Sequence, residues 1–327
     1  MDHLPWHRDN WEIITKQFAA GRNPHALLLH GSSGLGKQVF AENLSSLLLC
    51  KAPEESKHCG RCKSCVIREA GTHADLRHVS PEDSGQIKVD HIKELTRWAI
   101  QSSQHGGYKI AIIHPLEKMN LQSANALLKG LEEPPPHTLY ILVTDDIESI
   151  LPTVRSRCQN IFFNIPKHAE ALRWLKSQCE HTENLPQLLI QSEGAPLEVL
   201  KMLSSGYIGL RDDVTQNLLA LLSGENNPLE KASNLQKYQP LDVLKVLENF
   251  ASTAIKLSMV EDLQDIGSQS QENASARLAV SLEAIQLFQF RDQLLKAIRD
   301  LGGNSNPNPL LLLEAVLVNL NHSQMRK

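Results

Sequence analysis

The sequence has no long apolar run and no excess of basic residues. No segment approaches the roughly 18 consecutive apolar positions of a membrane-spanning helix. The chain does not open with a basic segment followed by an apolar one, so we expect no signal peptide and a cytoplasmic location. Lysine and arginine number 33 against 37 acidic residues, which gives a net charge of −4. Nucleic-acid binding is driven by clustered positive charge. This chain is therefore not expected to bind DNA alone, and any function on DNA would need partner proteins.

Aromatic residues are also scarce, at 5% of the chain, whereas hydrophobic residues make up 41% and charged residues 21%. This balance is typical of a soluble globular protein. A length of 327 residues allows two or three domains with ample core.

Cysteines are few, but most of them are clustered. Four of the six have the spacing C-x8-C-x2-C-x2-C, namely Cys50, Cys59, Cys62 and Cys65. Because disulfides are disfavoured in the cytosol, a tetrahedral four-cysteine zinc site explains this spacing best, and a redox C-x-x-C pair is the main alternative. Four thiolates leave no coordination position for water, so the predicted role of the zinc is structural.

A glycine-rich loop follows the first apolar run of the chain. Residues 26–29 predict a short buried strand, and the apolar spacing from Val39 onward is helical. Between them the pattern G-x-x-x-x-G-K is fulfilled, with one additional glycine: Gly31, Gly34, Gly36 and Lys37. Strand, glycine loop and helix form the context in which backbone N–H groups, a helix N-terminus and a lysine bind phosphate.

The last position of this loop lacks the expected magnesium ligand. A serine or threonine hydroxyl normally holds Mg²⁺ there, and this chain has Gln38. Two interpretations stay open: ATP or ADP binds without turnover, or the loop is an inherited turn.

The first half of the chain alternates predicted helices and strands. We expect a helix over residues 9–21, capped by Asp9 or Asn10, and a helix over 89–99 with Asp90 as its cap. A helix over 123–132 ends before three prolines, and further strands are predicted over 75–79, 108–113, 139–143 and 161–163. This order predicts a mostly parallel α/β sheet covered on both faces.

Strand signals stop after Pro166, and the remaining chain is predicted to be helical. Short helices are expected over 168–179 and 187–203, followed by longer ones that are interrupted by polar stretches at 224–228, 267–271 and 302–307. One face of the last helix carries Leu310, Leu313, Leu317 and Leu320, which indicates helical core.

Two further motifs identify a family resemblance. The first is the run Ser-Ala-Asn-Ala-Leu-Leu-Lys-Gly-Leu-Glu-Glu-Pro-Pro at 123–135, and the second is Ser156-Arg157-Cys158. With the cysteine cluster placed after the phosphate loop, the chain resembles bacterial clamp-loader subunits of the AAA+ class. The resemblance is close over the first 200 residues and rests on helical character beyond them.

This resemblance implies a three-domain architecture. It predicts an AAA+-type P-loop domain over 1–165 with the zinc module at 50–65. It also predicts a small helical lid over 166–207 and an oligomerising helical collar over 208–327.

The same resemblance implies that ATP hydrolysis has been lost. Active members carry Asp-Glu after the strand at 108–113, where this chain has His114 and Pro115. They also carry a lid arginine at the place of Leu197. Together with Gln38, four positions that act in ATP hydrolysis in active members carry a residue here that cannot do so. No functional magnesium site is therefore expected. Glu117 is expected to point away from the site.

The resemblance assigns one residue a catalytic role in a neighbouring subunit. An arginine after a helix is usually a solvated surface residue, but the Ser-Arg-Cys register makes Arg157 an arginine finger acting in trans, and distinguishes it from Arg155. The implied partners are gamma/tau and delta subunits in a hetero-oligomeric ring that loads the sliding clamp onto primed DNA. The chain would then be no enzyme alone, but part of a DNA-directed DNA polymerase (nucleotidyltransferase) assembly in replication.

Two other functions fit the sequence less well. An active ATPase subunit of the gamma/tau type is opposed by the four losses. A stand-alone zinc-containing nucleic-acid-binding protein is opposed by the sequence pI of about 6.4.

Overall fold

The computed structural model describes residues 4–82, 85–179, 185–224, 227–259, 274–302 and 307–325. The chain divides into two compact units, Met1–Leu200 and Lys201–Lys327. The finer division into domains at 165 and 207 stays a prediction.

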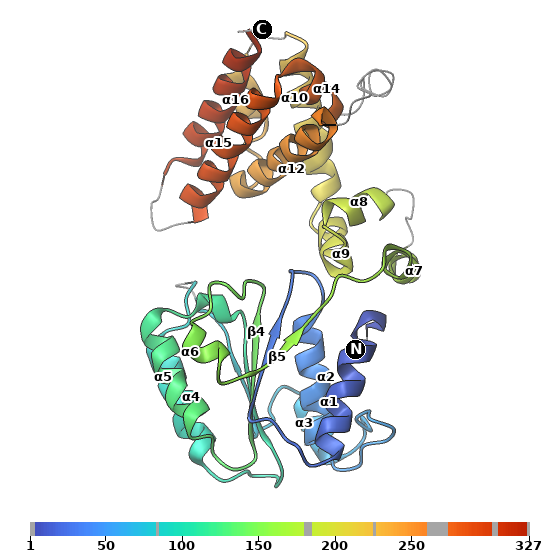
Figure 1. Ribbon diagram of the computed structural model, residues 1–327, viewed down its shortest axis with the longest axis vertical. Coiled ribbons are helices and arrows are strands. Elements are labelled where there is room, and N and C mark those ends of the chain that lie inside the picture. Colours follow the sequence, from blue (N-terminus) through green and yellow to red (C-terminus); the bar gives the residue numbers. More distant parts are fainter. Residues whose placement is uncertain are drawn as a thin grey trace. The chain divides into compact units, whose positions relative to one another are not determined.

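A parallel five-stranded sheet forms the centre of the first unit, with strand order β2-β3-β4-β1-β5 (Figure 1). The strands are β1 (Ala26–His30), β2 (Leu76–Val79), β3 (Lys109–Ile113), β4 (Thr138–Thr144) and β5 (Gln159–Phe162). The predicted strands and the parallel α/β sheet are therefore confirmed, with strand borders shifted by one or two residues.

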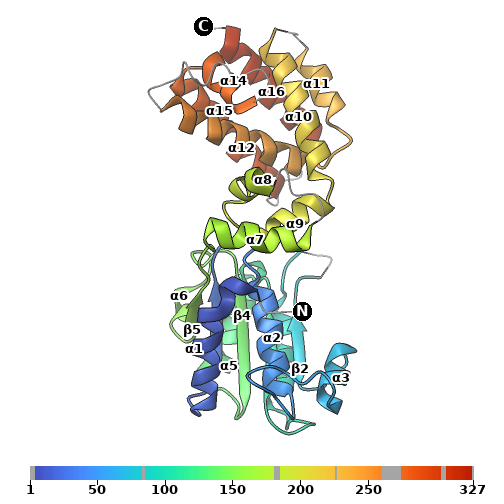
Figure 2. The same ribbon diagram turned by 90° about the vertical axis from the view of Figure 1, so that its right-hand side faces the viewer.

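Helices cover both faces of this sheet, as Figures 1 and 2 show. On one face lie α1 (Arg8–Ala19), α2 (Lys37–Leu49) and α3 (Lys63–Glu69), and on the other lie α4 (Val89–Ile100), α5 (Leu121–Glu132) and α6 (Pro152–Arg155). Because side chains alternate along a strand, β1 contributes to both cores. Leu27 and Leu29 pack with Phe40 of α2, whereas Leu28 packs with Ile92 of α4.

Two predicted helix caps are wrong. A 3₁₀ turn, η1 (Pro5–His7), precedes α1, so the helix begins earlier than Asp9 or Asn10 would allow. Pro5 favours this early start because its ring fixes φ near the helical value. The cap of α4 is Lys88, and Asp90 lies in the first turn, where its charge complements the helix dipole.

The rest of the first unit is helical. It contains η2 (Leu116–Lys118), α7 (His168–Gln178), α8 (Leu185–Gln191) and the start of α9 (Pro196–Ser204). The helix predicted over 168–179 is confirmed as α7. The one predicted over 187–203 is instead two helices, α8 and α9, because the chain turns between them at Gly194, where φ is 85°. Trp6 of η1 packs edge-on against Trp174 of α7, with ring centroids 5.1 Å apart.

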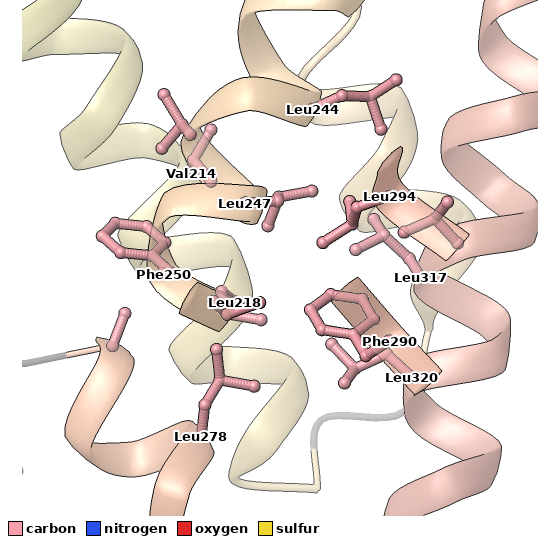
Figure 3. Packing of buried hydrophobic residues seen from close by; sticks show 14 of the residues in the cluster. Val214, Leu218, Leu244, Leu247, Phe250, Leu278, Phe290, Leu294, Leu317 and Leu320 are labelled. Atoms are coloured by element: carbon pink, nitrogen blue, oxygen red, sulfur yellow. The ribbon is translucent and has the colours of Figure 1, made fainter. Parts of the chain in front are cut away.

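Helices alone form the described part of the second unit. They are α10 (Tyr207–Leu222), α11 (Pro228–Asn234), α12 (Pro240–Ser258), α14 (Ala274–Ser281), α15 (Ala284–Gly302) and α16 (Pro309–Met325). Figure 3 shows aliphatic side chains and the rings of Phe250 and Phe290 pointing toward one another from these helices. Leu313, Leu317 and Leu320 are at most 3% exposed, which confirms the predicted leucine face of the last helix.

The predicted polar break at 224–228 separates α10 from α11. The break at 267–271 lies outside the described residues, as does most of 302–307. Within the described residues, no helix combines the length and the apolar character that crossing a membrane requires.

Candidate functional site

The phosphate-loop lysine is held by three acceptors from the chain itself. Lys37 begins α2 and is only 3% exposed. Its Nζ donates to the carbonyl oxygens of Gly31 and Ser32, both at 2.6 Å. It also lies 2.6 Å from Oδ1 of Asp145, which directly follows β4. An ammonium group has three N–H donors, so these three acceptors satisfy it fully.

The N-terminal segment lies over the middle of the loop. The Trp6 indole donates its Nε1–H to the Leu35 carbonyl oxygen at 2.9 Å, and Nε2 of the buried His7 ring lies 2.8 Å from the same oxygen. A Cβ atom on Gly36, where φ is 82°, would lie 2.3 Å from Cδ1 of Leu4. The positive φ favours glycine at position 36, and a larger residue there would also displace the terminal methyl group of Leu4.

The start of α9 covers the other side of the loop. The Leu197 N–H donates to the Gly34 carbonyl oxygen at 3.1 Å. A Cβ on Gly34 would lie 2.8 Å from the backbone nitrogen and Cβ of Glu198. Leu197, where the family resemblance predicted the loss of a lid arginine, thus contributes a backbone hydrogen bond to the loop and an apolar side chain that lies close to Gly36.

His114 and Pro115 lie at the carboxyl end of β3, beside the loop. Burial lowers the pKa of His114, the charges of Asp145 and Glu117 raise it, and the charge of Lys37 lowers it further. The net direction is downward, so the imidazole is neutral near pH 7 and adds no charge to the site. Pro115 has no ionisable group.

Glu117 lies near enough to His114 for its charge to raise the pKa of that imidazole, so the expectation that Glu117 points away from the site is wrong. Glu117 lies in η2, and its Oε2 accepts a hydrogen bond from the Thr144 hydroxyl at 2.7 Å. Its carboxylate is therefore engaged at the end of β4. Gln38, in the first turn of α2, is exposed to solvent.

The four predicted cysteines come together after α2. The sulfur atoms of Cys50, Cys59, Cys62 and Cys65 all lie within 4.8 Å of one another, and none forms a disulfide. Zn–S bonds of about 2.3 Å in a tetrahedron place the sulfurs about 3.8 Å apart, so the cluster is suited to a metal ion such as zinc.

The surroundings of Cys62 and Cys65 shift the pKa values of their thiols in opposite directions. Cys62 caps α3, and backbone N–H groups, that of Lys51 foremost, lower its pKa to about 6. Burial raises the pKa of Cys65, one turn into α3, to about 12. Because a cysteine binds a metal ion as its thiolate, a bound cation would stabilise the charged form that burial disfavours at Cys65.

A buried hydrogen-bond chain ties the cluster to the sheet domain. The Ser64 hydroxyl donates to the carbonyl oxygen of Leu49, the residue before Cys50, at 2.6 Å. His73 Nε2 lies 2.9 Å from the same hydroxyl, and His73 Nδ1 accepts from the Asp75 N–H at 3.1 Å. This pattern requires the Nε2–H tautomer, and burial lowers the pKa of His73.

The predicted arginine finger lies just after α6. The side chain of Arg157 is 36% exposed, and its Nη2 lies 2.7 Å from Oε1 of Glu132, the last residue of α5. Its Nη1 donates to the Thr153 carbonyl oxygen at 3.0 Å. Arg155 makes a longer contact, 3.6 Å, to Glu148. The structure thus gathers Lys37, His114 and Leu197 around the loop and ties Arg157 to α5.

Sequence reasoning missed several residues that shape these sites. Asp145 follows an apolar strand beside the phosphate loop, and that position was a usable signal. The covering role of Leu4 and His7 had no such signal, because nothing in the sequence places the N-terminus on the loop. Glu132 and His73 are found only through their contacts in the folded chain.

Two family models match most of the chain. One is described as "DNA polymerase III, delta subunit" and matches residues 6–167, and the other, "DNA polymerase III, delta subunit, C terminal", matches residues 206–322.

Curated relatives and a solved structure agree with these models. DNA polymerase III subunit delta' of Pseudomonas aeruginosa is 31% identical over 323 residues, 97% of each chain. The subunit of the same name from Yersinia pestis is 32% identical and covers 97% of this chain and 95% of its own. The fold matches a DNA polymerase III gamma subunit-related protein from Thermotoga maritima with a TM-score of 0.54 and 19% identity, covering 98% of this chain and all of that one.

Proposed function

The chain belongs to the family of DNA polymerase III delta' subunits, and on that premise we propose that it is a non-hydrolysing subunit of the clamp loader. In this proposal it assembles with gamma/tau and delta subunits into a ring. It holds that ring in a fixed geometry and contributes to loading the sliding clamp onto primed DNA. Its catalytic contribution is made at the ATP of a neighbour.

One observation carries the non-hydrolysing part of the proposal. Within the phosphate loop, Lys37 is paired with Asp145 and with two loop carbonyl groups. Hydrolysis needs a carboxylate that orients Mg²⁺ and a base that positions water, and the end of β3 offers a neutral imidazole and a proline instead. The packing of Leu4 and Leu197 against Gly36 supports a loop that serves as a structural turn.

We assign zinc to the four-cysteine cluster, with a structural role. The support is the donor set, because four thiolates within 4.8 Å of one another match a closed tetrahedral site. The hydrogen-bond chain through Ser64 and His73 supports this role as well, since it anchors the module to the sheet. Zinc bound there would hold the segment from Cys50 to Cys65 in one conformation.

We assign the arginine finger to Arg157. Its guanidinium is partly exposed and is oriented by two acceptors on its own chain. Charge spreads over the phosphoryl oxygens during transfer, so a fixed cation stabilises the transition state more than the ground state. The planar guanidinium bridges two oxygens, which a lysine ammonium does not do.

We propose the three domains that the family resemblance implies. Residues 1–165 form the AAA+-type domain with its zinc module, 166–207 the lid, and 208–327 the collar that oligomerises. The separate aliphatic core of the second unit supports a collar that folds around its own helices.

Reconstitution tests the proposal directly. The purified chain should hydrolyse no ATP above background, and Gln38→Thr should not change this, because His114 and Pro115 still supply no carboxylate. The complex assembled with the chain should load clamps, and the complex without it should not. Turnover by the isolated chain that disappears in Lys37→Ala would refute the assignment.

A further inference from the structure

Arg157 and Glu132 join two separate elements of the first unit. Arg157 follows α6, and Glu132 ends α5. The guanidinium is held at two different nitrogens, Nη2 by the Glu132 carboxylate at 2.7 Å and Nη1 by the Thr153 carbonyl at 3.0 Å. Two contacts at two nitrogens fix the plane of the group, whereas one contact would leave it free to swing.

The position of Glu132 is not explained by the stability of its helix. A carboxylate at the last residue of a helix faces the negative end of the helix dipole, which is unfavourable. Glu132 is also 49% exposed, and ion pairs this open contribute little to stability. What Glu132 does achieve is to place an acceptor on one edge of the Arg157 guanidinium.

We propose that Glu132 is a positioning residue that pre-orients Arg157 for the ATP of the neighbouring subunit. This inference rests on the proposed finger role of Arg157. A guanidinium has five N–H groups, and the two contacts described engage one on each terminal nitrogen. Nη1 also lies 3.5 Å from the Ser156 hydroxyl oxygen, which leaves the second N–H of Nη2 and the Nε–H to reach two phosphoryl oxygens. Because the side chain is ordered beforehand, less rotamer freedom is lost when the transition state forms.

A neighbouring pair in the same segment provides a matched control. Arg155 and Glu148 are also an arginine and a glutamate of the first unit, but their atoms are 3.6 Å apart and Glu148 is 83% exposed. Glu148→Ala removes a carboxylate near α6 without touching Arg157.

The test uses the complete complex reconstituted with variants of this chain. Glu132→Ala should lower kcat of the DNA-stimulated ATPase about two- to tenfold, the loss expected when one arginine side chain is no longer ordered, and should leave KM for ATP unchanged. Glu132→Gln keeps an acceptor of the same reach and should stay within about twofold of wild type. Glu148→Ala should behave as wild type. Thermal unfolding and assembly of each variant show that the fold is intact.

A double-mutant cycle separates this inference from the finger assignment. If Arg157→Ala lowers kcat and Glu132→Ala adds no further loss in that background, the two residues act through one another. If Arg157→Ala lowers kcat while Glu132→Ala alone leaves it unchanged or raises it, the positioning role is wrong and the finger stands. If Glu132→Gln loses as much as Glu132→Ala, the hydrogen-bond geometry inferred here is wrong. If Arg157→Ala has no effect, the finger assignment itself fails.

Discussion

Lys37 Nζ and Asp145 Oδ1 lie 2.6 Å apart, so the cation of the phosphate loop is paired with a carboxylate of its own chain. In phosphate loops that bind nucleotide, the same lysine contacts phosphate oxygens. Asp145 provides Lys37 with an anionic oxygen from within the fold. The loop can therefore persist as a packed turn with its charge balanced.

This pairing predicts a stability cost when Lys37 is removed. Lys37→Met should lower the free energy of unfolding by about 1–3 kcal/mol, because the carbonyls of Gly31 and Ser32 and the Asp145 carboxylate lose their common donor. Urea unfolding of the chain measures the difference. Lys118→Met, at an exposed position of η2, serves as the control and should change little. A Lys37→Met chain as stable as wild type would mean that the lysine has no structural role.

Metal removal tests the four-cysteine site. Protein purified without chelator should contain one zinc ion per chain, and Cys62→Ser should lose it and unfold at a lower temperature. Serine is itself a good N-cap, so α3 keeps its cap in this variant and the effect reports the metal. Cys179→Ser, outside the cluster, should retain the zinc. Less than about a tenth of an equivalent in the wild-type chain would overturn the zinc assignment.

The sheet was predictable because its strands are short apolar runs bounded by glycine or polar residues. In β3 and β4 every residue is buried, so the apolar pattern and the strand coincide. The four cysteines were predictable for a similar reason, since metal ligands cluster in sequence when one small loop carries them.

Contacts between distant segments were not predictable in the same way. The Lys37–Asp145 pair depends on β1 and β4 being neighbours in the sheet, and strand order is not visible in apolar spacing. The cap of α1 was misassigned because Pro5 starts a 3₁₀ turn before it. Residue preferences favour Asp9 as a helix cap, but the 3₁₀ turn that precedes α1 already places Asp9 inside the helix.

The core of the second unit offers a test of its independence from the first. Leu317→Ala should cost about 2–5 kcal/mol, because it opens a cavity among the helices shown in Figure 3. Leu311→Ala, at a position 60% exposed on the same helix, is the control and should cost little.

Two optical probes distinguish the units in this experiment. The four tryptophans, Trp6, Trp11, Trp98 and Trp174, all belong to the first unit, so their fluorescence follows that unit. Far-UV circular dichroism follows the helices of both. We expect Leu317→Ala to shift the dichroism transition and to leave the fluorescence midpoint unchanged. An equal shift in both probes would show that the two cores unfold together.

The functional proposal depends most on Arg157. Arg157→Ala should leave the fold, the zinc content and complex assembly intact, because the side chain is 36% exposed and its ion pair with Glu132 is at the surface. The DNA-stimulated ATPase and clamp loading of the complex should fall. Arginine fingers contribute roughly 10³ to 10⁵ in rate at their own site, and loss at one of several sites in a ring gives a smaller change in the total.

Arg155→Ala is the matched control for this variant. It removes a guanidinium two residues away that is paired with Glu148 at 3.6 Å, and it should reduce activity much less. Lysine at position 157 should not restore the rate, since an ammonium does not bridge two phosphoryl oxygens as the planar guanidinium does. If the assembled Arg157→Ala complex loads clamps at the wild-type rate, the chain is a passive scaffold, and its contribution to the ring is geometric alone.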